Sequence, residues 1–101
     1  MVIYLKLHQT RMGKILAACD ANIVGKTFSE GEKYLDLGKY KGFYGDKKAT
    51  LGEFLAALKG DFSSANLVGR NVIAAAEEAK VLEKEDIMYV QNVPYAQIYY
   101  M

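Results

Sequence analysis

Two apolar stretches near the start of the chain are separated by only five residues, and this spacing constrains the fold more than any other feature. From Val2 to His8 apolar and polar side chains alternate, which is the period of a half-buried β-strand. A second apolar run, residues 14–19, follows a short polar connection that ends in Gly13. Connections of this length join antiparallel strands. The sequence therefore predicts a β-hairpin at the start of the fold.

Two helices are predicted in the second half of the chain. Thr50 and Glu53 have the spacing of a capping box, and Gly60 stands where a helix commonly stops, which indicates a helix over residues 51–59. Residues 70–80 hold four alanines and one apolar stripe, a pattern typical of an amphipathic helix.

The remaining segments complete an α+β pattern. Alternation over residues 33–37 predicts a third strand, and residues 87–90 and 93–99 are rich in β-forming side chains. Residues 22–32, 38–48 and 61–69 are predicted to be loops. Pro94 cannot donate to a ladder, so the last strand is expected at an edge or paired only beyond that residue. The order ββ-β-α-α-ββ predicts a single α+β domain over residues 1–101, with a mixed or antiparallel sheet and two helices packed on one face.

Composition excludes several classes of protein. No apolar run approaches the ~20 residues of a membrane span, and the N-terminal stretch lacks the pattern of a signal peptide. The lone Cys19 excludes an internal disulfide bond and suits a reducing cytoplasm. We therefore expect a cytoplasmic protein with no membrane contact, and no motif calls for a metal, a cofactor or a catalytic residue set.

Charge is distributed unevenly, although the net charge is only +1. Residues 1–60 carry ten Lys and Arg against six Asp and Glu, whereas residues 61–101 carry three against six. The split indicates one basic face or an accidental asymmetry of a solvated surface.

The stretch from Lys39 to Lys48 combines lysines with aromatic rings and glycines. Lysines can neutralise phosphates and exposed rings can stack on unpaired bases, which is the chemistry of a single-stranded RNA contact. The alternative is that the rings turn inward and pin the loop while the lysines are merely solvated. The predicted nucleic-acid contacts are Lys39, Tyr40, Lys41, Tyr44, Lys47 and Lys48.

A six-residue pattern, Ala-Asn-aliphatic-Val-Gly-basic, occurs twice, at residues 21–26 and 65–70. One interpretation is a single turn chemistry used twice, because Asn and Gly both favour turns. The other is an anion site, in which free amides around the glycine and the adjacent cation hold a phosphate or carboxylate. The candidate anion-binding residues are Asn22, Gly25, Lys26, Asn66, Gly69 and Arg70.

Two further functions stay open. A small enzyme would use Cys19, His8 and Asp20, although a cysteine in an apolar run is usually an inert core residue. A protein–protein interaction module or homodimer would pair through the uncharged C-terminal strand, residues 95–100, which otherwise pairs within the chain.

Five motifs carry a resemblance to a known family. They are Ala17-Ala18-Cys19-Asp20, residues 23–28, Phe43-Tyr44-Gly45, residues 64–69 and residues 93–98. In this order they resemble an uncharacterised archaeal family, the domain of unknown function number four-two-four. The resemblance implies a cytoplasmic, single-domain archaeal protein and no established activity. Together with the basic-aromatic stretch, it leads us to expect a non-enzymatic binding protein that contacts RNA or a ribonucleoprotein of the translation machinery.

Overall fold

The computed structural model describes residues 2–38, 41–44 and 47–99 of the chain. The predicted hairpin is present as β1 (Ile3–Thr10) and β2 (Gly13–Asp20), which pair antiparallel along their whole length. The other elements, in chain order, are β3 (Thr27–Glu30), β4 (Lys33–Asp36), α1 (Lys41–Tyr44), β5 (Lys48–Ala49), α2 (Leu51–Leu58), β6 (Ser64–Val68), α3 (Arg70–Glu78), η1 (Lys84–Asp86), β7 (Met88–Val90) and β8 (Val93–Tyr99).

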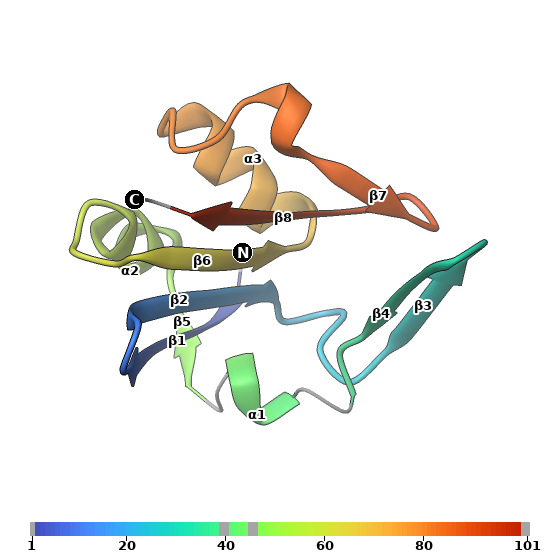
Figure 1. Cartoon of the computed structure of the whole chain (residues 1–101), viewed down its shortest axis with the longest axis horizontal. Helices are drawn as coiled ribbons and strands as arrows, with labels where there is room; N and C mark the ends of the chain where they lie inside the picture. The colour runs from blue at the N-terminus through green and yellow to red at the C-terminus, as the bar shows by residue number, and fades with distance from the viewer. Residues whose placement is uncertain (1, 39–40, 45–46, 100–101) are drawn as a thin grey trace.

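A six-stranded sheet in the order β5-β1-β2-β6-β8-β7 forms the centre of the fold (Figure 1). β2 and β6 run parallel, and every other neighbouring pair in this sheet runs antiparallel. α2 and α3 cover one face, where Phe54, Val72 and Leu16 are among the buried side chains of the larger core. The predicted α+β class, with a mixed sheet and two helices on one face, is confirmed.

A second, smaller core lies on the other face of the sheet. Ala17, Cys19 and Val68 point from the sheet toward Leu37 and Tyr44, which come from the segment containing β4 and α1. β3 and β4 form a separate two-stranded hairpin that stands beside the sheet (Figure 1). The chain between β2 and α2 therefore forms a partial second layer, and the cleft described below lies at its margin.

Both predicted helices are present. The capping box of α2 is complete, because the Glu53 amide donates to Thr50 Oγ1 at 3.1 Å and the Thr50 amide donates to Glu53 Oε1 at 3.0 Å. α3 begins at Arg70, as predicted, and ends at Glu78, two residues early. None of the helices in the described ranges is long and apolar enough to cross a membrane.

Three loop predictions were wrong. β6 lies within residues 61–69, β3 within residues 22–32 and α1 within residues 38–48, and β5 begins at Lys48. The sequence of β6, Ser-Ala-Asn-Leu-Val, has little β-propensity of its own, and its strand geometry comes from pairing with β2 on one side and β8 on the other. Long-range pairing of this kind is not visible in a local pattern.

The last strand is not at an edge, which corrects half of the prediction from Pro94. β8 lies between β6 and β7, and Pro94 is opposite Tyr89 of β7. Pairing with β6 begins only at Tyr95, so the missing amide proton of Pro94 falls outside the β6 ladder.

Candidate functional site

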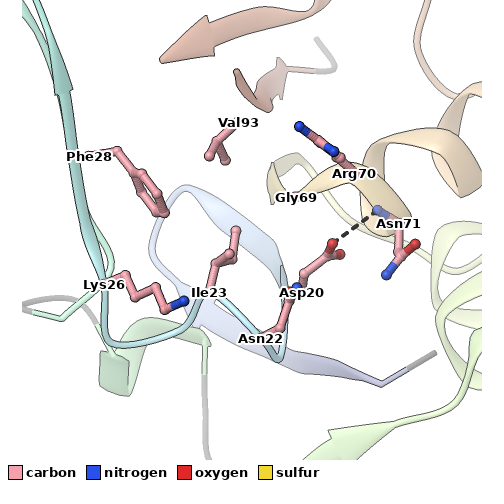
Figure 2. A pocket seen from close by; sticks show the side chains of 9 residues that line it. All are labelled: Asp20, Asn22, Ile23, Lys26, Phe28, Gly69, Arg70, Asn71 and Val93. Atoms are coloured by element: carbon pink, nitrogen blue, oxygen red, sulfur yellow. Dashed lines mark hydrogen bonds between the residues drawn. The ribbon is translucent and has the colours of Figure 1, made fainter. Parts of the chain in front are cut away.

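A pocket of about 410 Å³ lies between the turn after β2, the start of α3 and β3. It is lined by Asp20, Asn22, Ile23, Lys26, Phe28, Gly69, Arg70, Asn71 and Val93 (Figure 2). Both copies of the repeated pattern reach it, since Asn22 and Lys26 come from the first and Gly69 and Arg70 from the second.

Asp20, the buried last residue of β2, lines this pocket and caps α3. Its Oδ2 accepts the Asn71 amide at 3.0 Å and its Oδ1 accepts the Val72 amide at 2.9 Å. The residue before α3 is Gly69, which has no side chain to cap the helix. Burial raises the pKa of Asp20 above its ordinary value, and the two amide hydrogen bonds oppose that shift. The carboxyl group is thus a structural cap fixed between β2 and α3.

Gly69 is required by this cap. Its φ of +110° is closed to most side chains, and a Cβ there would lie 2.3 Å from Asp20 Cγ. The Gly69 amide donates to the Pro94 carbonyl at 2.8 Å, which ties the start of α3 to β8.

The backbone part of the predicted anion site is wrong. The Asn71 and Val72 amides at the start of α3 donate to Asp20, and the Gly25 amide donates to the Leu37 carbonyl at 3.2 Å. Gly25 and Asn66 are not among the residues that line the pocket. The prediction of one turn used twice is also wrong, because residues 21–25 form turns whereas the second copy spans β6 and the start of α3.

The two cations of the pattern are nevertheless brought together. Figure 2 shows Lys26 and Arg70 at different sides of the pocket, with the Phe28 ring and the Val93 side chain as an apolar wall between them. Both cationic side chains are exposed, and neither forms a hydrogen bond or ion pair with any described residue. Their charges are therefore available to an anion from solution.

Lys48 extends the same surface. A neighbouring pocket of about 470 Å³ is lined by Val2, Ala21, Asn22, Lys48 and Asn71. It shares Asn22 and Asn71 with the first pocket, so the two hollows are contiguous. We call this combined region the cationic cleft, with Lys26, Arg70 and Lys48 as its three cations.

The basic-aromatic stretch is only partly as predicted. Tyr44 is 6% exposed, and burial raises the pKa of its hydroxyl, so the prediction that its ring stacks on a base is wrong. Phe43 stacks on His8 with ring centroids 4.7 Å apart, which pins α1 to β1. Lys47 and Lys48 are exposed. Lys39 and Tyr40 lie outside the described residues, as does the side chain of Lys41.

The three residues of the enzyme alternative are not assembled. Cys19 lies opposite Tyr4 in the β1–β2 ladder and His8 lies opposite Ile15, four positions further along, or about 13 Å at strand spacing. His8 Nε2 is 2.6 Å from the Phe43 carbonyl oxygen. Burial, with a smaller effect from the Asp20 charge, raises the pKa of Cys19 to about 12. Cys19 is therefore an inert core thiol, and the Asp20 carboxylate already accepts two amide hydrogen bonds from α3.

Metal binding has no visible support in residues 2–38, 41–44 and 47–99, where no three His, Cys, Asp or Glu side chains are grouped closely enough to hold an ion. The chemistry that the cleft offers is electrostatic attraction of an anion, with an apolar wall beside it.

The sequence family follows from a match to residues 7–101, nearly the whole chain, by the model of a family described as a protein of unknown function (DUF424). The chain belongs to the DUF424 family. This confirms the resemblance given by the five motifs. No functionally curated protein is detectably similar to the chain.

A solved structure shares the DUF424 fold seen here. It is described as an uncharacterized conserved protein from Methanopyrus kandleri and superposes with a TM-score of 0.76 at 20% sequence identity. The match covers 98% of this chain and 91% of the other. At this identity the likeness shows the fold alone.

Several residues of the cleft were missed by sequence reasoning. Phe28 and Val93 are apolar members of motifs that were used only for the family resemblance, and Asn71 lies one residue beyond the repeated pattern. Phe28 also belongs to a strand that was predicted to be a loop. Asp20 was named only in the enzyme alternative, and its role as a helix cap was not predicted, because the helix it caps starts 50 residues later in the sequence.

Proposed function

We propose that this protein is a non-enzymatic binding protein that holds single-stranded RNA in its cationic cleft. The observation that carries the proposal is the convergence of Lys26 and Arg70 on one pocket without an ion-pair partner among the described residues. Unpaired cations at a concave surface attract phosphate groups.

The apolar wall favours RNA over a simple anion. Phe28 is half-buried and lines the pocket beside the two cations, so a base can stack on it while its phosphate meets a lysine or arginine. Lys48, in the adjoining pocket, provides a third cation along the same path. A chain of phosphates and bases matches three separated charges better than a single small anion does.

The partner class remains the one expected from the sequence, an RNA or ribonucleoprotein of the cytoplasmic translation machinery. The contact residues differ from that expectation. The proposed contacts are now Lys26, Arg70 and Lys48, with Phe28 replacing Tyr44 as the stacking ring.

Salt dependence of binding is the test. A labelled single-stranded RNA of ~10 nucleotides would be titrated by fluorescence anisotropy between ~50 and ~200 mM salt. Each phosphate contact contributes a slope of about −0.7 in log K against log salt, so the Lys26→Gln/Arg70→Gln variant should lose about 1.4 from the slope.

The matched control is Lys59→Gln/Lys84→Gln, which removes two exposed lysines that do not line the cleft. It should change the slope much less than the cleft variant. Absence of binding at the lowest salt, or an equal effect of the two double variants, would overturn the proposal.

A second candidate function is self-association through β8. β7 pairs with β8 only from Val93 to Tyr95, while β8 continues to Tyr99, whose side chain is 72% exposed. We propose as the alternative that the part of β8 beyond its pairing with β7 pairs with a second copy of the chain. Light scattering over a range of concentrations should then show a dimer that Tyr99→Lys dissociates, and a monomer at every concentration would exclude it.

A further inference from the structure

A pocket on the face of the sheet opposite α2 and α3, which we call the sheet-face pocket, contains two side-chain amides with no partner among the described residues. This pocket, of about 320 Å³, lies between β4, α1 and the strands β6 and β8. Asn66 and Gln97 line it and are opposite each other in the β6–β8 register, so their side chains are neighbours on one face. Neither side-chain amide has a hydrogen-bond partner among the described residues.

The rest of the lining is largely apolar. Leu35 and Leu37 contribute aliphatic side chains, and Tyr34, Phe43 and Tyr44 contribute aromatic rings. Tyr34 is 67% exposed, whereas Phe43 is held in place by its stack on His8. A planar, uncharged ligand can therefore contact carbon on its faces and the two amides at its edge.

The charged residue that lines this pocket is acidic, whereas the cationic cleft has three basic residues. Asp36 is its one charged residue among the described lining, and its carboxylate accepts from the hydroxyl groups of Thr27 and Tyr34, each at 3.4 Å. A carboxylate repels phosphate but not a neutral ring. The volume is at the lower end of the ~300–1,000 Å³ range of small-ligand sites, which suits a group the size of a nucleobase.

The two sites border neighbouring strands of the β3–β4 hairpin. Phe28 lines the cationic cleft and its cross-strand partner Leu35 lines the sheet-face pocket. Cross-strand partners point to the same face, so both residues lie on the face of the hairpin that packs against the second core.

We propose that the sheet-face pocket binds an unpaired nucleobase and that the amides of Asn66 and Gln97 read its edge. Each amide offers donors and an acceptor, which is the complement of a base edge. This inference rests on the proposed RNA function, to which it adds the means by which the chain distinguishes one base from another.

Free nucleosides test the pocket without its phosphate-binding neighbour. Adenosine, cytidine and uridine would be titrated separately while the side-chain amide resonances are followed by NMR. One of the three should shift the resonances of Asn66 and Gln97 while leaving that of Gln9, an exposed amide on β1, unmoved. The same shifts should persist in Lys26→Gln/Arg70→Gln, because a nucleoside carries no phosphate. No movement of either amide with any nucleoside would overturn the inference.

RNA selectivity gives a second readout that separates the two proposals. Wild type should prefer one of the oligonucleotides A6, C6 and U6, and Gln97→Ala should reduce that preference about tenfold with an unchanged salt slope. Gln97 is exposed, so its substitution leaves the fold intact, and Gln9→Ala is the matched control. RNA binding that keeps its salt slope and its base preference in Gln97→Ala would overturn the inference while the cationic cleft stands.

Discussion

The two copies of the Ala-Asn-aliphatic-Val-Gly-basic pattern share a sequence and little else. The first, residues 21–26, forms turns between β2 and β3, and the second, residues 65–70, forms most of β6 and the first residue of α3. Their asparagines are separated into different pockets, since Asn22 lines the cationic cleft and Asn66 the sheet-face pocket. Of the matching positions in the two copies, only the basic residues, Lys26 and Arg70, both line the same pocket.

The difference shows that neighbours, and not the pattern, decide the local structure. The second copy has β2 on one side and β8 on the other, so its backbone groups join two ladders. The first copy follows the end of β2 at Asp20, and outside its own turns its backbone makes isolated hydrogen bonds to Val2 and Leu37. The glycines differ accordingly. A Cβ on Gly25 would meet nothing within 4 Å, whereas one on Gly69 would collide with Asp20.

The largest expected effect concerns the junction of β2 with the second copy, where Cys19 lies opposite Val68. With the pKa of Cys19 raised from 9.0 to about 12, its thiolate fraction at neutral pH should be about a thousandfold below that of an exposed cysteine. Thiol labelling at pH 8 should be slower than in the urea-unfolded chain by at least this factor, and should accelerate only in strong alkali. Equal labelling rates in the folded and the urea-unfolded chain would mean that Cys19 is accessible to reagent in the folded protein.

The two glycines should respond unequally to the same substitution. Gly69→Ala must adopt a strained φ and displace the Asp20 cap, so we expect a loss of ~3 kcal/mol in the free energy of unfolding. Gly25→Ala has the strained φ alone, +92°, and should lose ~1 kcal/mol. Urea unfolding of both variants measures the difference, and equal losses would remove the distinction between the copies.

The hydrogen bonds that cap α3 can be weakened by a substitution that keeps the size of the Asp20 side chain. Asp20→Asn replaces one accepting oxygen with an NH2 group that faces a backbone N–H, so the chain should lose ~1–3 kcal/mol. Faster amide exchange at Val72 would locate the loss at the start of α3. Asn22→Ala is the control in the first copy, expected to stay within ~0.5 kcal/mol of wild type because Asn22 is exposed. A neutral Asp20→Asn would show that α3 does not depend on this contact.

The smallest expected effect is on stability at the two basic residues. Lys26→Gln and Arg70→Gln should each change the free energy of unfolding by less than ~0.5 kcal/mol, because both side chains are exposed and lack partners among the described residues. A larger loss in either would assign that cation to the fold and weaken its proposed role in binding. Thermal melting of the two variants beside wild type is sufficient.

Sequence reasoning succeeded where a local pattern determines the structure. The capping box at Thr50 and Glu53, the alanine-rich helix beginning at Arg70 and the first hairpin all depend on residues close together in the chain. Alternation over residues 33–37 likewise predicted β4. Sequence reasoning failed for β6, whose strand geometry depends on β2 and β8, and for β3, the four-residue partner of β4.

The candidate site was also predictable only as far as residues close together in the sequence form it. The repeated pattern led to Asn22, Lys26, Gly69 and Arg70, all of which line one pocket. The role of Asp20 was hidden, because its partner amides lie 51 and 52 residues away, and so was the burial of Tyr44. A sequence pattern shows which side chains are present, but not which of them the fold buries or uses in its own hydrogen bonds.

A double-mutant cycle between Lys26 and Arg70, measured on RNA affinity, tests most directly whether the two copies build one binding site. If both cations hold the same RNA segment in the cleft, the two single variants and the double variant should show a coupling of at least ~0.5 kcal/mol. Effects that add to within ~0.3 kcal/mol, or RNA affinity that no member of the cycle changes, would show that the cations act apart and that the cleft is not the site.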